Sequence, residues 1–140
     1  MEIHVDLPER FVFEVRRLVE ADDVNYGGHL ANEAFLKIAS QARVRFLEKH
    51  GLSELDVGGV GIIMTGAVIE YLAEGREGDE IVTSIAVEQT RRSSFAIFYR
   101  IARADDGVIL AKVRTDLACF DYQARKVRRI PDRFMGVISG

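Results

Sequence analysis

The spacing of hydrophobic residues changes from strand-like to helical early in the chain. In "FVFEVRRLV" (11–19), apolar residues alternate with other residues from Phe11 onward, which predicts a strand. From Ala31 to Phe46 apolar residues instead recur at steps of three and four, with charged and polar residues between them. This second pattern predicts an amphipathic helix of about five turns that ends near Gly51.

Beyond residue 52 the helical period is absent, and four segments have the length and composition of strands. These segments are residues 60–72, 81–89, 94–103 and 108–122. The Asp-Gly pair in "ADDGV" (104–108) is typical of a hairpin, and "EGREGDE" (74–80) predicts a charged turn. A basic turn then leads to Pro131 and a short tail. The order of strand, helix and four strands predicts an α+β domain in which one helix covers a face of an antiparallel sheet.

The segment 60–72 is apolar on both of its predicted faces. Ile62 and Met64 point to one side of such a strand, whereas Ile63 and Ile69 point to the other. One helix cannot cover five strands, so part of this apolar surface stays exposed, and large exposed apolar patches usually mark association surfaces. We therefore expect a homodimer or homotetramer, most simply built on a two-fold axis, with a site that draws residues from both chains.

Composition narrows the classes of protein that fit. The 140 residues predict a single domain (1–140), and 48% hydrophobic and 29% charged residues are ordinary for a globular chain. The net charge of -3 and the lack of a dominant basic patch argue against nucleic-acid binding. A single cysteine, Cys119, together with an N-terminus unlike a signal peptide, leads us to expect a cytoplasmic protein. No apolar stretch approaches the ~18 residues of a membrane span, and the scattered histidines predict no metal site.

The stretch "VNYGGHLANEAF" (24–35) precedes the predicted helix and is the strongest candidate for a site. Its glycines allow close approach of a substrate to the backbone, and the first N–H groups of the helix can supply hydrogen-bond donors. The same residues also fit a tight strand-to-helix turn in which Asn32 caps the helix. The residues alone leave both interpretations open.

Four sequence marks follow one another along the chain. They are the pattern Asp23-x-Asn25-x-x-Gly28-His29-x-x-Asn32, "QARVRFL" (41–47), "RRSSF" (91–95) and "ACFDYQARKVRRIP" (118–131). With these marks the chain resembles the hot-dog-fold acyl-CoA thioesterases of the 4-hydroxybenzoyl-CoA thioesterase type. The resemblance spans nearly the whole chain and implies a five-stranded antiparallel sheet wrapped around one long helix. It also implies hydrolysis of an acyl-CoA thioester to free acid and CoA, at a site near the helix N-terminus and a subunit interface.

The resemblance assigns roles in holding the substrate. It directs the thioester carbonyl toward backbone donors at Gly28 and Asn32, and it places Arg91 and Arg92 at the phosphates of CoA. Arginine suits this second role because its planar guanidinium matches phosphate oxygens. Coenzyme A enters only as part of the substrate, so we expect no separate cofactor.

The family's catalytic acid falls on Asn25 in this sequence. An amide cannot act as a nucleophile or general base in the manner of a carboxylate. Asn25 could still orient a water molecule while a neighbouring group takes the proton. The candidates for that group are His29, Asp23 and Glu33, and Glu70 on the segment 60–72 is a further acid.

Two other functions remain open on the same fold. Hot-dog enoyl-CoA hydratases use an Asp-x-Asn…His arrangement that Asp23, Asn25 and His29 echo, although the spacing is one residue longer and Tyr26 stands at the usual proline. Alternatively, the missing acid at position 25 fits a non-catalytic protein that binds acyl-CoA or an acyl carrier.

Overall fold

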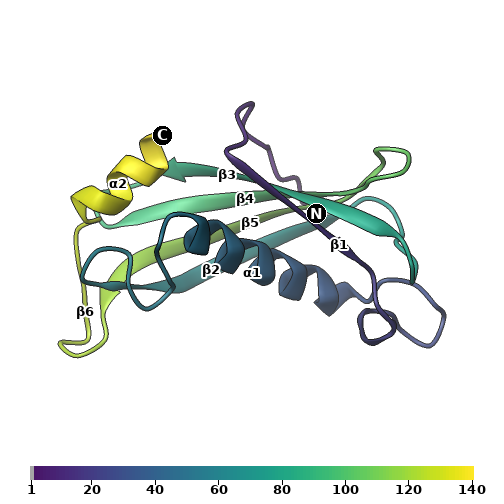
Figure 1. Ribbon diagram of the computed structural model, residues 1–140, viewed down its shortest axis with the longest axis horizontal. Helices are drawn as coiled ribbons and strands as arrows, with labels where there is room; N and C mark the ends of the chain where they lie inside the picture. Colours follow the sequence, from purple (N-terminus) through teal and green to yellow (C-terminus); the bar gives the residue numbers. More distant parts are fainter. Residues whose placement is uncertain (1) are drawn as a thin grey trace.

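The computed structural model describes residues 2–140 and consists of an antiparallel sheet with one long helix against it (Figure 1). The sheet runs in the order β1-β3-β4-β5-β2, and a short β6 pairs with β5. The strands are β1 (Phe13–Leu18), β2 (Gly61–Tyr71), β3 (Glu80–Gln89), β4 (Ser94–Arg103), β5 (Ile109–Asp121) and β6 (Lys126–Val127). The helices are a 3-10 turn η1 (Ala21–Asp23), α1 (Asn32–Lys49) and α2 (Asp132–Ser139). The expected α+β arrangement is confirmed, with β6 as a two-residue addition.

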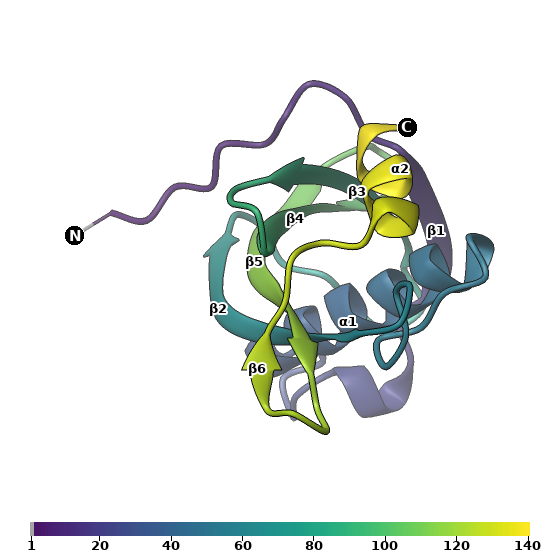
Figure 2. The same cartoon turned by 90° about the vertical axis from the view of Figure 1, so that its left-hand side faces the viewer.

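The sheet curves around α1 and encloses the main hydrophobic core (Figure 2). Alternate residues of β4 face the helix, as its sequence predicts: Phe95, Ile97 and Tyr99 are fully buried there. From the helix, Phe35 and Phe46 pack into the same core. Because a fully buried large apolar side chain contributes about 1.5–3 kcal/mol, this row fixes how α1 lies on the sheet.

The opposite face of the sheet is covered by the N-terminal segment, which the sequence pattern did not reveal. Phe11 was expected inside the first strand, but β1 begins at Phe13. Phe11 instead packs against a second small cluster that includes Val5 and Phe98, and the Arg100 guanidinium lies over its ring, 4.6 Å from the centroid. The first apolar residues of the chain thus serve the outer face of the sheet and not the core around α1.

The expected tail after Pro131 is in fact the helix α2. Pro131 is its N-cap, and Phe134 is buried with its ring 4.9 Å from that of Phe95. The helix thereby closes one end of the core. Among residues 2–140, no helix has the length and apolar character to cross a membrane.

Strand β2 lies at the edge of the sheet and carries exposed apolar side chains. Ile63, Met64 and Val68 are partly exposed along the strand, and Tyr71 and Leu72 are exposed at its end. The expected apolar surface on this segment is therefore present. An unpaired strand edge beside such a surface is a natural place for a second chain to associate.

Candidate functional site

The stretch between β1 and α1 forms a tight hairpin. Val24 pairs with Leu30, the Asn25 N–H donates to the His29 carbonyl at 2.9 Å, and the Gly28 N–H donates to the Asn25 carbonyl at 2.9 Å. Gly28 has a φ of 78°, a conformation that glycine adopts without the strain a side chain brings. The hairpin therefore positions Asn25 and His29 side by side at the entrance to α1.

The side chain of Asn25 is used within this hairpin. Its Oδ1 accepts hydrogen bonds from the N–H of Gly27 at 3.0 Å and of His29 at 3.3 Å. Asparagine commonly caps turns in this way. At the position where the resemblance expects an acid, the chain thus has an amide that holds the backbone of His29 in place.

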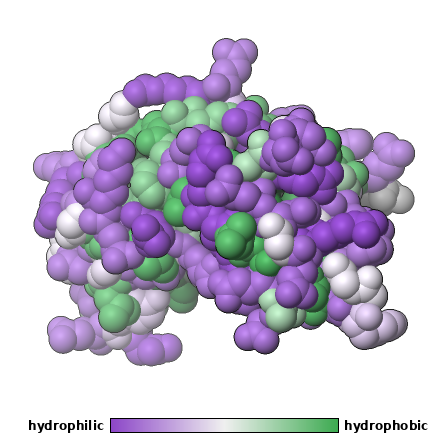
Figure 3. All heavy atoms as spheres, turned by 45° about the vertical axis from the view of Figure 1, so that its right-hand side comes forward, coloured by the Kyte–Doolittle hydropathy of each residue, from purple (hydrophilic) through white to green (hydrophobic). Residues whose placement is uncertain are grey.

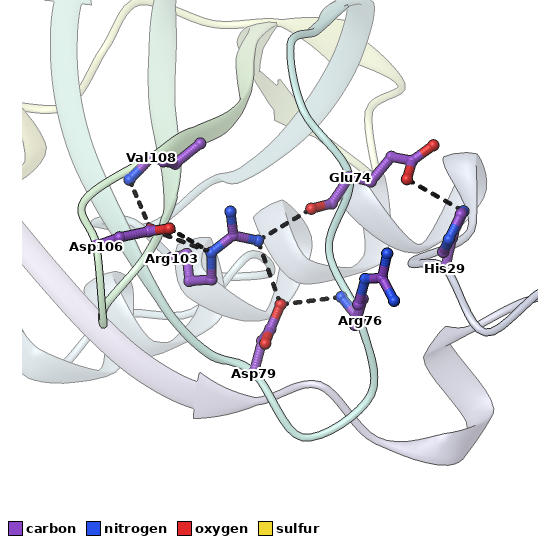
Figure 4. Close-up of polar contacts among 7 residues, drawn as sticks. All are labelled: His29, Glu74, Arg76, Asp79, Arg103, Asp106 and Val108. Atoms are coloured by element: carbon purple, nitrogen blue, oxygen red, sulfur yellow. Dashed lines mark hydrogen bonds and ion pairs between the residues drawn. The ribbon is translucent and has the colours of Figure 1, made fainter.

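The imidazole of His29 meets a carboxylate from the turn between β2 and β3. His29 Nδ1 lies 3.4 Å from Glu74 Oε2 (Figure 4). The backbones are also joined, because His29 bridges to Arg76 and the Leu30 N–H donates to the Gly75 carbonyl at 2.7 Å. The sequence marked this turn only as charged, and no local spacing connects Glu74 with His29.

Asp23 is buried, with only 1% of its surface exposed, and is held by two cations. Its carboxylate pairs with Arg17 and lies 2.6 Å from Lys37 Nζ, and it accepts the Glu20 N–H at 2.8 Å. Burial alone raises the pKa of the Asp23 carboxyl. The hydrogen bonds from Lys37 and the Glu20 backbone, together with the two positive charges, outweigh burial and lower this pKa. Asp23 therefore stays ionised and connects η1 to β1 and α1.

The first turn of α1 presents free backbone donors. Ala31 is the N-cap, so the alternative in which Asn32 caps the helix is wrong. Asn32 is the first helical residue, and among residues 2–140 its N–H has no acceptor. The Gly28 N–H is already used in the hairpin, so of the two expected backbone donors Asn32 is the free one. Glu33 is exposed in this first turn, where a carboxylate also stabilises the helix dipole.

Tyr71, at the end of β2, packs against the first turn of α1 beside these donors. The Tyr71 hydroxyl donates to the Asn32 carbonyl at 3.2 Å, and the rings of Tyr71 and Phe35 meet edge to face at 5.5 Å. The surface on the side where α1 starts is largely hydrophilic, with hydrophobic groups gathered in patches (Figure 3). The free donors of α1 therefore lie beside one exposed aromatic ring, that of Tyr71, whereas Phe35 is buried.

Arg91 and Arg92 lie far from this end of the protomer. They are exposed in the turn between β3 and β4, whereas His29 contacts the turn at the other end of β3 (Figure 1). The ten residues of β3 separate the two turns by about 30 Å. A single protomer therefore does not bring the arginine pair together with the hairpin.

Two other kinds of chemistry receive no support from the described residues. Residues 2–140 contain no group of three or more His, Cys, Asp or Glu side chains that could hold a metal ion. Cys119 is buried, which raises the pKa of its thiol to about 11. The thiol is therefore protonated near neutral pH and is a poor nucleophile.

An antiparallel sheet wrapped around one long helix is the hot-dog fold, and solved structures with this fold match the chain closely. The structure of a 1,4-dihydroxy-2-naphthoyl-CoA thioesterase from Synechocystis superposes with a TM-score of 0.84 at 24% identity, covering 91% of this chain and 95% of that one. A Staphylococcus aureus protein in complex with CoA superposes with a TM-score of 0.82 at 17% identity, covering 97% of this chain and 86% of that one.

Sequence comparison identifies the family. The model of the Thioesterase-like superfamily matches residues 19–138, and the chain belongs to this family. A 1,4-dihydroxy-2-naphthoyl-CoA hydrolase from Synechocystis sp. is 24% identical over 129 residues, which cover 90% of this chain and 94% of that protein. The expected class of enzyme, a thioester hydrolase, is confirmed.

Proposed function

We propose that this protein hydrolyses an acyl-CoA thioester to a free acid and CoA at the start of α1. The observation that carries the proposal is a free helical N–H at Asn32 that follows, three residues later, the partly exposed imidazole of His29 on the preceding hairpin. The N–H and the helix dipole can stabilise a negative oxygen, and the imidazole can accept a proton.

The reaction follows from these two groups. As a water oxygen bonds to the thioester carbon, His29 Nε2 takes a proton from that water and the carbonyl electron pair moves to the oxygen held by the Asn32 N–H. When the intermediate collapses, the C–S bond breaks and the thiolate leaves with the proton from His29. Water and thioester thus become acid and thiol, and the imidazole returns to its neutral form.

The edge of β2 supports a site shared by two copies. If β2 pairs antiparallel with β2 of a second copy, the far end of the partner's sheet comes next to the start of α1. Arg91 and Arg92 of the partner subunit would then approach the start of α1, where they could bind CoA phosphates. The exposed apolar residues of β2 would be covered at the same time.

The interface can be tested through Met64, which is exposed on β2. Met64→Lys places a charge in the proposed contact, so we expect a monomer by light scattering and a loss of thioester hydrolysis. Leu55→Lys changes an exposed apolar residue outside β2 and is the control, expected to keep the wild-type assembly. A fully active Met64→Lys monomer would refute the shared site.

An aromatic acyl group is the first substrate class to test. The Synechocystis relative is named for a 1,4-dihydroxy-2-naphthoyl group, and the Staphylococcus aureus structure contains CoA. The exposed ring of Tyr71, which packs edge to face on the buried Phe35, lies beside the start of α1, where an aromatic group could stack on it.

The activity is tested by thiol release from a panel of aromatic and aliphatic acyl-CoAs. We expect release of free CoA, fastest with aromatic groups, and a loss of at least ~10-fold in turnover for Asn25→Ala, because the His29 N–H then loses its side-chain acceptor. Absence of release across the whole panel would rule out the hydrolase. Loss of enoyl-CoA absorbance would then favour a hydratase, and tight binding without turnover would favour a binding protein.

A further inference from the structure

We propose that Glu74 is a positioning residue for the reaction: its carboxylate orients the His29 imidazole so that Nε2 faces the thioester as the proton acceptor. The inference rests on the proposed hydrolysis and adds to its site a residue from outside the hairpin. It concerns the turn between β2 and β3, whose charge the sequence shows but whose contact with the hairpin appears only in the fold.

The carboxylate of Glu74 pairs with Nδ1 of the His29 ring and not with Nε2. Glu74 Oε2 lies 3.4 Å from Nδ1, so Nδ1 is the ring nitrogen that meets the carboxylate, and a proton held there would leave Nε2 with its lone pair. This is the division of roles that a carboxylate–histidine pair uses in general base catalysis. The distance is longer than a hydrogen bond, and such contacts commonly tighten when a substrate binds. The side chains are 38% and 66% exposed, so the pair lies at the surface and not in the core.

The backbone that carries Glu74 is braced from the sheet (Figure 4). Arg103 Nη1 donates to the Glu74 carbonyl at 3.1 Å and lies 3.4 Å from Asp79 Oδ2. Asp79 Oδ2 in turn accepts the Arg76 N–H at 3.0 Å. Asp106 pairs with Arg103 Nε at 3.1 Å and keeps its guanidinium in place. A turn with this bracing can present a carboxylate at a defined position.

The turn also packs tightly against the hairpin at Gly75. A Cβ added at Gly75 would lie 3.1 Å and 3.2 Å from atoms of Leu30 and 3.2 Å from Leu110. The glycine therefore permits the contact through which the Leu30 N–H reaches the Gly75 carbonyl. Both members of the His29–Glu74 pair thus lie on segments tied to each other.

The other groups at this end do not replace the pair. Asp23 is engaged by Arg17 and Lys37, and the Asn25 amide cannot accept a proton at neutral pH. His29 instead meets the carboxylate of Glu74 and bridges through its backbone to Arg76. Glu33 lies on α1, four residues beyond His29, with its side chain exposed.

The test compares Glu74→Gln with Glu77→Gln. Both remove one negative charge from the same exposed turn, but Glu77 has no contact with His29. We expect Glu74→Gln to lower kcat by about 10-fold to 100-fold with little change in KM, and Glu77→Gln to match wild type. In a double-mutant cycle with His29→Ala, adding Glu74→Gln should cost nothing further, because the two residues act as a unit.

A second readout does not depend on turnover. Nitrogen NMR of the His29 ring reports which nitrogen carries the proton, and we expect the Nδ1–H form in wild type and in Glu77→Gln. Glu74→Gln should shift the ring toward the Nε2–H form. An unchanged ring form and unchanged kcat in Glu74→Gln would overturn the role of Glu74 while leaving the hydrolase intact. A wild-type protein that releases no thiol would instead overturn the proposed function, and the NMR comparison would still decide whether Glu74 orients the ring.

Discussion

Asp23→Asn separates a structural role for Asp23 from a catalytic one. The substitution keeps the shape of the side chain and an oxygen for the Glu20 N–H, but it removes the negative charge opposite Arg17 and Lys37. Because Asp23 is 1% exposed and both oxygens face these partners, we expect a loss of stability as the first effect. Any loss of hydrolysis should follow from unfolding.

The size of the stability loss depends on how far Arg17 and Lys37 are exposed to solvent. Removing one partner of a fully buried ion pair costs about 3–5 kcal/mol, because the remaining charge is left unsolvated. The side chains of Arg17 and Lys37 are 21% and 46% exposed, so water can solvate them in part. We therefore expect a loss of about 2 kcal/mol in the free energy of unfolding. For a chain of this length, that corresponds to roughly 7 °C in Tm.

The pH dependence has a definite sign. The pKa of Asp23 is lowered in the folded protein, so the carboxylate stabilises the fold fully above its unfolded pKa of about 3.9. This contribution is lost as the pH falls through the lower folded pKa. The difference in stability between wild type and Asp23→Asn should therefore be largest near pH 7 and shrink below about pH 4.

Wild type and Asp23→Asn are compared by urea unfolding at pH 7 and at pH 3. Thiol release is measured for both proteins well below the Tm. Asp22→Asn is the matched control, because the neighbouring Asp22 is exposed and pairs with no cation among residues 2–140. If Asp23→Asn unfolds like wild type but no longer hydrolyses a thioester, Asp23 acts in the chemistry and the reasoning above is refuted.

Three further substitutions test separate parts of the structure. Arg43→Met should lower stability by about 3 kcal/mol in urea unfolding, because the buried guanidinium donates to the Tyr99 hydroxyl and to Glu54; an unchanged midpoint would refute this. Gly28→Ala should cost about 1 kcal/mol, because φ is 78° while nothing lies within 4 Å of the added Cβ, and a loss above ~3 kcal/mol would point to an unseen clash. Replacing both Arg91 and Arg92 by alanine should raise KM for acyl-CoA about 10-fold at constant kcat, and this increase should be smaller in high salt. An unchanged KM would show that the pair does not bind the phosphates.

Most of the fold could be predicted because its periodicities are long. The segment from Ala31 gave the helix Asn32–Lys49 within a residue of its start, and the four later strands lie close to their expected bounds. The two ends of the chain were assigned incorrectly. Phe11 continues the period of β1 in sequence but turns to the other face of the sheet. Helix α2 has only eight residues. Its helical spacing is carried by Phe134, Val137 and Ile138, and a pattern this short cannot be distinguished from that of an irregular tail.

The candidate site could be predicted only where its residues are neighbours in sequence. The hairpin and the first turn of α1 bring Asn25, His29 and Asn32 near one another because all three lie within the short stretch 25–32, which leaves the chain little freedom. Glu74 comes from a turn beyond a helix and a strand, so its contact with His29 depends on the sheet register. The engagement of the Asn25 amide within its own turn also depends on backbone geometry that spacing does not specify.

Position 25 offers a last test of where the proton acceptor acts. Asn25→Asp keeps an oxygen for the N–H groups of Gly27 and His29, so the hairpin should persist, while its second oxygen adds a base. If His29 is the acceptor in this protein, His29→Ala should abolish hydrolysis. Adding Asn25→Asp to it should restore at least ~10-fold, because a carboxylate can then activate water from the hairpin. Failure of the rescue in a folded double variant would mean that position 25 does not face the thioester, and that the amide of Asn25 serves only to hold the hairpin.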